Sequence, residues 1–394
     1  SYPSWMFSEP STGKYFRDMS AAYSQAHPDV NIDLIQLPAA SYVERIFTEV
    51  QGGQVPDILP LFTTQMPQYM QLDLLEPLDP YLDKSTFKSK LLPLQRFAQK
   101  GGKNYGIVLT ASPQGLLINH LLLEKAGVQI PTTLDELYSA ADKIYKATGV
   151  FGYGVHTDTS AMLLSYVSCM QWILGNGSDF TKADGTITCN TKATVEGFQQ
   201  MMRFVNAPFA PKGQGWYQLR EMFAEGKLAM LWDGPWDLGQ VKTVNPNLYP
   251  YIDMAPCPTK THAAITGGAF YAILRKEQNK QAVWDYLAFA TSDEWQRRWI
   301  EVEVQVPGIA IEPAAAFIRT NPGYRYVTEI AAKYATGFGY LPPGYVNVAT
   351  ALQTKVIAHV GDIWSGTKSP QVGMDECQRE LEAWAKTLAP GSRD

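Results

Sequence analysis

The chain has 394 residues, more than one compact core usually accommodates, so two lobes of ordinary domain size are expected. Charged residues make up only 18% and aromatic residues 12%, and the net charge is −5, so the composition offers no basic stripe for a nucleic-acid partner. No run of about 18 apolar residues occurs, so no membrane-spanning helix is predicted, and residues 1–9 lack the basic start and apolar stretch of a signal peptide.

Strand and helix patterns alternate in the first part of the chain. Residues 2–7 are predicted to form a strand, residues 15–23 a helix, and residues 30–34 a second strand. A helix over 42–50 and a short buried strand over 56–59 continue the pattern. Repeated strand–helix–strand units predict an α/β fold with a mainly parallel sheet covered by helices.

A capping box is predicted further along, where Thr133 is followed by Glu136 before the helix that carries Leu137 and Ile144. In such a box the threonine hydroxyl accepts a hydrogen bond from the backbone N–H three residues later, which fixes where the helix begins. We therefore expect a helix to begin directly after Thr133.

The stretch from Phe223 to Trp236 is the most informative of the chain. Gly226 suits the left-handed residue after a helix, residues 228–232 form an apolar strand run, and Pro235 fits the first turn of a new helix. In open α/β sheets such strand-to-helix turns line ligand crevices, so Asp233 and Trp236 are expected at the mouth of one. A flat indole beside a hydrogen-bonding carboxylate suits a sugar.

Three short segments rich in proline or small residues, 109–113, 266–269 and 306–313, predict places where the chain crosses between lobes. Three crossings would make both lobes discontinuous and leave a cleft between them. After the last crossing, the apolar patterns over 352–357 and 377–384 predict two closing helices separated by the loop 365–370.

Catalytic motifs are absent from the sequence. It has no serine-hydrolase elbow, zinc-protease motif, phosphate-binding loop or complete dinucleotide-binding glycine motif, and its five histidines lack the spacing of metal ligands on one helix. Asp233 with Asp237, or Glu301 with Glu303, would be the pairs to test for glycoside hydrolysis. A carboxylate in a first helical turn explains Asp237 without catalysis. We expect neither a cofactor nor a metal.

Short segments with turn glycines, prolines and apolar residues follow one another in a characteristic order: 53–58, 75–78, 105–107 with Asn119, 122–127 with Pro131 and Thr133, 223–236, 267–268 and 366–370. Together they resemble the bacterial extracellular solute-binding proteins of family 1, the maltose-binding-protein-like group that serves ATP-driven sugar importers. The resemblance covers nearly the whole chain. It implies a periplasmic-binding-protein-like type II fold, with two discontinuous α/β lobes, three hinge segments and a ligand clamped between the lobes without catalysis.

By this resemblance the N-terminal lobe comprises residues 1–110 and 268–312, and the C-terminal lobe comprises residues 111–267 and 313–394. The resemblance also implies secretion to the periplasm or cell surface with the signal peptide removed, possible lipid anchoring, and permease subunits of an ABC transporter as partners of a monomer. The first strand begins almost at Ser1, which indicates that mature residues before it are missing.

The family's ligand contacts carry over to a set of polar and aromatic positions. In the first lobe and the crossing segments they are Ser8, Glu9, Tyr42, Thr63, Thr64, Gln65, Thr110, Ser112, Gly267, Gly268 and Phe270. In the second lobe they are Tyr166, Trp172, Trp232, Asp233, Trp236, Tyr340 and Tyr345, with Trp236 matching the sugar-stacking tryptophan. Gly267 and Gly268 let a backbone approach the ligand closely.

Two departures from the family pattern leave the ligand's identity open. Val108 replaces the usual proline after 105–107, and Thr63 begins a polar loop where some maltodextrin binders carry charged side chains. The site is rich in hydroxyl, amide and aromatic groups, so a neutral mono- or oligosaccharide, glycoside or polyol is expected. A glycan-processing enzyme using Asp233 or Glu9, and a chemoreceptor-coupled sugar sensor, are the alternatives.

The four cysteines Cys169, Cys189, Cys257 and Cys377 are too far apart in sequence for a metal or redox CxxC motif. Their even number fits an oxidising compartment but is also ordinary for a cytosolic protein. We expect at least one disulfide and pair Cys169 with Cys189 and Cys257 with Cys377, because both members of each pair fall in the second lobe.

Overall fold

The computed structural model describes residues 1–38, 41–334, 341–389 and 391–393. Its contacts divide the chain into two compact units, each made of two separate stretches. Unit 1 comprises Ser1–Ser112 and Gly267–Arg325, and unit 2 comprises Pro113–Thr266 and Tyr326–Asp394. In the described part of the chain, no helix has both the length and the apolar character needed to cross a membrane.

The first two boundaries lie close to the predicted crossings, but the third lies at 325/326 instead of 312/313. The segment 306–313 is held in unit 1, because Pro307 pairs with Thr110 in an isolated antiparallel bridge. The helix that follows it also stays there, since its Phe317 ring packs edge-on against Tyr324 at 5.4 Å. The proline-rich composition of this segment therefore marks a turn within unit 1.

Unit 1 contains a parallel strand pair and a three-stranded sheet. Strand β1 (Tyr2–Ser4) pairs with β2 (Leu34–Gln36), and the sheet has the order β3 (Leu59–Phe62), β10 (Thr266–Ala272), β6 (Ile107–Pro113). A further short pair joins β4 (Gln99–Lys100) to β5 (Lys103–Asn104). The helices are η1 (Trp5–Ser8), α1 (Pro10–Ala26), α2 (Tyr42–Gln51), α3 (Met66–Gln71), α4 (Asp79–Leu82), η3 (Lys88–Lys90), η4 (Pro93–Ala98), α11 (Lys280–Ala290), α12 (Asp293–Glu303), α13 (Ala315–Thr320) and α14 (Pro322–Arg325).

The core of unit 1 is built around aromatic rings. Tyr2, at the start of β1, is fully buried and meets Phe7, Phe16 and Tyr286 edge-on. The strand predicted over 2–7 ends early, because the Ser4 side chain accepts a hydrogen bond from the Met6 N–H and begins the 3-10 helix η1. This helix brings the loop after β1 directly into α1.

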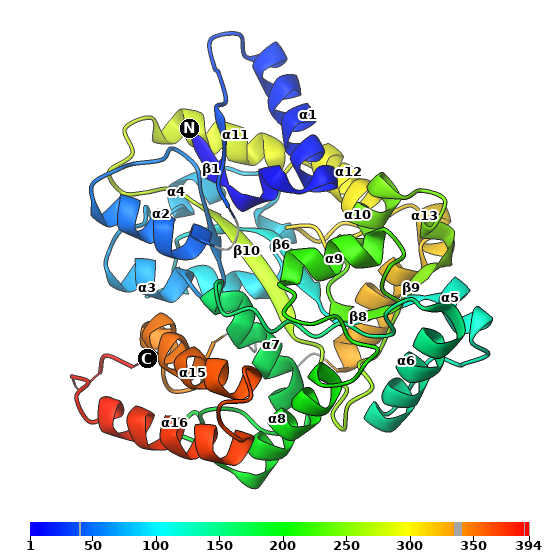
Figure 1. Cartoon of the computed structure of the whole chain (residues 1–394). Helices are drawn as coiled ribbons and strands as arrows, with labels where there is room; N and C mark the ends of the chain where they lie inside the picture. Colours follow the sequence, from blue (N-terminus) through cyan, green and yellow to red (C-terminus); the bar gives the residue numbers. More distant parts are fainter. Residues whose placement is uncertain (39–40, 335–340, 390, 394) are drawn as a thin grey trace. The chain divides into compact units, whose positions relative to one another are not determined.

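Unit 2 has one three-stranded sheet, in the order β8 (Met230–Asp233), β7 (Gly115–Asn119), β9 (Ile252–Ala255). The C-terminal helices α15 and α16 lie beside α7 and α8 (Figure 1). These four helices contribute to one continuous apolar core, which also includes Leu116 of β7 and Met230 of β8. The helices are α5 (His120–Lys125), α6 (Leu134–Thr148), α7 (Met162–Gly175), α8 (Lys192–Val205), α9 (Trp216–Ala224), α10 (Trp236–Val244), η5 (Tyr249–Tyr251), η6 (Tyr326–Ile330), η7 (Ala331–Lys333), η8 (Val346–Val348), α15 (Ala349–Trp364) and α16 (Pro370–Ala385).

The prediction of a mainly parallel sheet is wrong for the described strands. The β1–β2 ladder is parallel, and residues 151 and 154 form isolated parallel bridges with 228 and 231, but β10 runs antiparallel to β3, and both β8 and β9 run antiparallel to β7. The prediction assumed that each strand follows its neighbour through a helical crossover. Strand β10 instead returns to unit 1 after the chain has passed through unit 2, so no such crossover sets its direction.

Local signals in the sequence place several helix ends correctly. The Thr133 hydroxyl accepts a hydrogen bond from the Glu136 N–H at 3.2 Å and caps α6, although the Glu136 carboxylate bonds Thr132 instead of Thr133. Gly226 is left-handed with a φ of 77°, after the end of α9. Between α15 and α16, Lys368 forms ion pairs with a carboxylate on each of the two helices. The predicted helix start after Thr133 and the closing helices are therefore confirmed, whereas the capping box is only half formed.

Candidate functional site

Asp233 ends strand β8 as a fully buried carboxylate. Its Oδ2 accepts a hydrogen bond from Nε of Arg220 at 2.6 Å, and its Oδ1 accepts one from Nη2 of the same guanidinium at 3.2 Å. The indole N–H of Trp216 donates to Oδ2, and the Gly234 N–H donates to Oδ1 at 2.7 Å. Both carboxylate oxygens therefore have protein partners within unit 2.

Arg220, on helix α9, is shared by two carboxylates. Its Nε lies 3.4 Å from Oδ1 of Asp237 as well as next to Asp233. Burial acts to lower the pKa of Arg220, but the attraction of the two carboxylates outweighs burial and raises the pKa. The guanidinium therefore stays charged, and the buried charge around it is balanced by its partners.

Trp236, the first residue of α10, is positioned by its surroundings. Its ring folds back over Gly234, where an added Cβ would lie only 2.2 Å from a ring carbon. The Arg220 guanidinium lies 5.2 Å from the ring centroid, within the range of a cation–π contact. The side chain is half-buried, so an indole with restrained orientation stands at the edge of the charged cluster.

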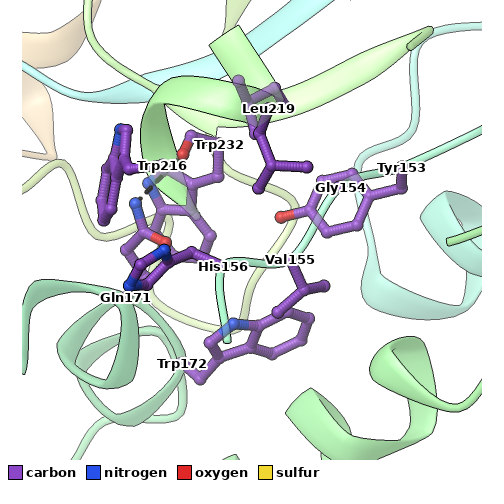
Figure 2. Close-up of a pocket in the computed structure, with 10 residues that line it drawn as sticks. Tyr153, Gly154, Val155, His156, Gln171, Trp172, Trp216, Leu219 and Trp232 are labelled. Atoms are coloured by element: carbon purple, nitrogen blue, oxygen red, sulfur yellow. Dashed lines mark hydrogen bonds between the residues drawn. The ribbon is translucent and has the colours of Figure 1, made fainter. Parts of the chain in front are cut away.

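A small cavity lies within unit 2, and Trp216, the indole that donates to Asp233, is one of its lining residues (Figure 2). Trp172, Trp216 and Trp232 line it, together with His156 and Gln171. Its volume is about 10 Å³, roughly the space of one water molecule and far too small for a sugar ring. The cavity is therefore part of the interior of unit 2 and is not itself a sugar site.

The polar groups around this cavity are only partly satisfied. Gln171 donates to the Gln114 side chain and to the Trp232 carbonyl, both at 3.1 Å. Burial lowers the pKa of His156 to about 4, so its imidazole is neutral at neutral pH. Its Nδ1 and the indole N–H of Trp232 have no partner among the described residues. Trp172 and Trp232, both expected to touch ligand, are 3% exposed and contribute to this interior.

In unit 1, the loop after β1 leads into a carboxyl-rich cluster. Glu9 occupies the N-cap position of α1 without a side-chain capping bond, and the Thr12 hydroxyl lies 3.2 Å from its Oε2 and 2.8 Å from Oε2 of Glu303. Ser11 donates to the same Glu303 oxygen at 3.2 Å. Burial, reinforced by the nearby charge of Glu9, raises the pKa of Glu303 to about 8. Glu303 is therefore a neutral acid at neutral pH.

Thr63 and Thr110, which were expected to contact ligand, form hydrogen bonds to neighbouring segments of unit 1. The backbone N–H and hydroxyl of Thr63 both lie 3.1 Å from the Gly268 carbonyl oxygen. The Thr110 hydroxyl is 3.0 Å from the carbonyl of Val306. An added Cβ at Gly268 would come within 3.0 Å of the Thr63 hydroxyl, so the backbones do approach closely there.

The other residues of this region that were expected to contact ligand differ in their exposure and in their hydrogen bonds. Ser8 is exposed, and its hydroxyl donates to the Trp5 carbonyl at 2.7 Å. Thr64 and Gln65 are buried, and the Gln65 carbonyl accepts a hydrogen bond from the Phe62 N–H. Gly267 begins unit 1's second stretch and is half-buried, whereas nothing of the Ser112 side chain is described.

Four aromatic residues expected to contact ligand are fully buried in this structure. The Tyr42 hydroxyl donates to the Pro60 carbonyl at 2.6 Å, and the Tyr345 hydroxyl donates to the Gly185 carbonyl at 2.8 Å. Phe270 and Tyr166 are also 0% exposed. In the Tyr42 and Tyr345 bonds, the tyrosine hydroxyl donates to a backbone carbonyl, where the prediction expected it to bond a ligand. Tyr340 lies outside the described residues.

The cysteine contact in the structure differs from the predicted disulfide pairs. The structure has all four cysteines as buried free thiols. It places the sulfur of Cys377 3.6 Å from that of Cys189, and neither of these two residues was paired with the other. The cause is helix packing, because α16 lies against α8 and the segment that precedes α8.

Sequence reasoning missed Trp216 and Arg220, the two partners that helix α9 supplies to Asp233. They are four residues apart, so they lie on one face of the helix that precedes the strand. That spacing was the signal available in the sequence. Elsewhere, no group of three or more His, Cys, Asp or Glu side chains is arranged to hold a metal ion within the described ranges.

Replacing Glu303 with glutamine is expected to flatten the pH dependence of stability. The folded state keeps the Glu303 proton up to a pKa of about 8, whereas an ordinary glutamate with a pKa of 4.5 loses it earlier. Between these values the folded state binds more protons, so the free energy of unfolding falls as pH rises. Urea unfolding at pH 5, 7 and 9 measures this fall. An equal fall in the Glu303→Gln variant would contradict the prediction.

The comparisons with known proteins agree with this fold. The family model described as bacterial extracellular solute-binding protein matches residues 8–297. A galactooligosaccharide-binding protein of Bacillus subtilis is 25% identical over 336 residues, which cover 82% of this chain and 76% of the relative. An arabinooligosaccharide-binding protein of Halalkalibacterium halodurans is 22% identical over 334 residues, covering 80% and 73%.

A solved structure of the GacH receptor of Streptomyces glaucescens superposes with a TM-score of 0.85 and 19% identity, covering 98% of both chains. At that identity the likeness shows the fold, which is that of the two-lobed α/β binding proteins expected from the sequence. The family match extends over most of the chain and joins residues of both units. The chain therefore belongs to the bacterial extracellular solute-binding protein family.

Proposed function

We propose that this protein is the substrate-binding component of an ABC importer that captures a neutral carbohydrate and delivers it to the permease subunits. The observation that carries the proposal is the half-buried Trp236 indole, restrained by Gly234 and by the Arg220 guanidinium. A sugar presents a face of C–H groups that packs well on such a ring. The relatives named for galacto- and arabinooligosaccharides support this ligand class.

The hydrogen-bonding groups of unit 1 suit the hydroxyls of a sugar. Glu9 and Thr110 are half-buried polar residues, whereas the hydroxyls of Thr12 and Thr63 are buried and already bonded within the unit. A micromolar dissociation constant needs about −8 kcal/mol. A few hydrogen bonds of roughly 0.5–1.5 kcal/mol each and one stacked ring face can supply this after ordering costs.

The charge of the candidate residues favours a neutral ligand. Arg220 is the cation of the unit 2 cluster, and it is already engaged by Asp233 and Asp237. A phosphate or sulfonate would have to compete with two carboxylates for one guanidinium. We therefore propose that the ligand lacks a strongly charged group.

The arrangement of Asp233 supports binding without catalysis. A glycosidase needs a carboxyl pair that can reach a glycosidic bond. Asp233 is fully buried and has donors on both oxygens, so it is poorly placed to protonate a leaving group or attack a sugar. We propose a periplasmic or cell-surface location, as the family description implies.

Calorimetric titration against neutral mono- and oligosaccharides and polyols tests this function. At least one neutral compound should bind with a micromolar or tighter dissociation constant, and its phosphorylated analogue should bind more weakly. A chromogenic glycoside incubated with the protein should release no product beyond a blank without protein. Absence of binding across the panel, or turnover that Asp233→Asn abolishes, would overturn the proposal.

A further inference from the structure

Two cysteines of unit 2 lie against each other in its core. Cys189 precedes α8 and Cys377 lies in α16, and both side chains are 0% exposed. The two sulfur atoms are 3.6 Å apart. Among the residues that the structure describes, Cys169 and Cys257 have no sulfur at hydrogen-bonding distance. Cys189 and Cys377 are therefore in direct contact, and Cys169 lies near enough to Cys377 to interact with it electrostatically.

The backbone on both sides of this pair is already held in place. The Asn190 side chain donates to the Asp375 carboxylate at 3.0 Å, and the Gln378 side chain donates to the Ile187 carbonyl at 3.0 Å. These two hydrogen bonds fasten the segment before α8 to α16 next to the sulfur atoms. A covalent link there would join two pieces of chain that are already side by side.

We propose that Cys189 and Cys377 form a disulfide bond in the exported protein, and that Cys169 and Cys257 remain thiols. The sulfur atoms must approach from 3.6 Å to about 2.05 Å. Each thiol loses a proton and the pair loses two electrons. The oxidant is the disulfide of a thiol–disulfide oxidoreductase or of a small molecule such as oxidised glutathione, which takes up both electrons and protons as two thiols.

The bond forms while the chain folds and the thiols are still accessible. Burial raises the pKa of the Cys189 thiol well above its ordinary value, so the folded reduced protein holds little of the reactive thiolate. Once formed, the link connects residues 188 positions apart in the sequence. Closing so long a loop restrains the unfolded chain strongly, so the link should stabilise unit 2.

Thiol counting on the full chain tests the proposal. The protein is exported to a bacterial periplasm, purified without reductant, and alkylated with iodoacetamide in guanidinium chloride. Intact mass should show two added groups, rising to four after reduction, and non-reducing proteolysis should yield one peptide pair joining Cys189 to Cys377. Reduction should lower the Tm by roughly 5–10 °C. Four alkylated thiols before reduction, or a linked peptide containing Cys169 or Cys257, would overturn the proposal.

Two cysteine variants distinguish the effect of losing the disulfide from the effect of losing any buried thiol. Cys257→Ser removes a buried thiol of the same unit and should keep the link and the reductant-sensitive Tm. Cys377→Ser should lose both. If Cys377→Ser does not fold, the thiol count of the unmodified protein still decides the question. Failure to bind a sugar would leave this result untouched, because neither measurement uses a ligand.

Discussion

Replacing Trp236 with alanine is expected to weaken carbohydrate binding by about 10- to 100-fold, which corresponds to roughly 1.4–2.8 kcal/mol. The variant removes the ring that Gly234 and Arg220 hold in place, and a sugar face loses its stacking surface. Calorimetric titration with a carbohydrate that binds the unmodified protein measures the loss. Trp236→Phe keeps an aromatic face and should lose less.

Trp384 supplies a matched control for this experiment. It is also a half-buried tryptophan of unit 2, but it lies in α16 and stacks on Tyr345 at 5.9 Å. Trp384→Ala should therefore lower stability without changing affinity. If Trp236→Ala and the unmodified protein bind the carbohydrate with equal affinity, Trp236 is not part of the binding surface.

Replacing Asp233 with alanine is expected to destabilise the protein by about 3 kcal/mol. The change leaves the Arg220 guanidinium buried without its bidentate partner, which is costly even though Asp237 remains 3.4 Å away. Urea unfolding followed by circular dichroism measures the difference. The double variant Asp233→Ala with Arg220→Met should recover part of the loss, since it removes the uncompensated charge.

The ion pair between Arg203 and Asp135 is the control for Asp233. It has the same 2.6 Å separation, but Asp135 is a surface residue with 84% of its side chain exposed. Asp135→Ala should therefore cost no more than about 1 kcal/mol. If Asp233→Ala and Asp135→Ala lower the free energy of unfolding equally, the buried ion pair does not contribute more to the stability of unit 2 than the exposed one.

The fold was predictable wherever a local pattern determines it. Residues 228–232 read as a strand and supply most of β8 (Met230–Asp233), and the helix whose first turn was expected to include Pro235 begins one residue later, at Trp236. Apolar periodicity and turn residues act over a few positions, so they are visible in the sequence. The direction of β10 was not visible, because its partner β3 is reached only after the chain has left unit 1 and returned.

The candidate site was only partly predictable for a related reason. The position of Asp233 at the end of a strand follows from local pattern, but its partner Arg220 comes from the packing of another element. Tyr42 shows a second limit, because an aromatic hydroxyl can face a ligand or a backbone carbonyl with the same sequence around it. The Cys189–Cys377 contact likewise depends on how α16 packs.

The discontinuity of unit 2 has a consequence for biosynthesis. Its core combines Phe198 and Met201 of α8 with Leu352 of α15 and Leu381 of α16. A ribosome synthesises those closing helices after the rest of unit 2, so the nascent polypeptide cannot complete this core until they have emerged. Until then the emerging chain exposes apolar surface that a chaperone could hold. Removing α16 by an early stop codon should accordingly yield a polypeptide that proteases degrade.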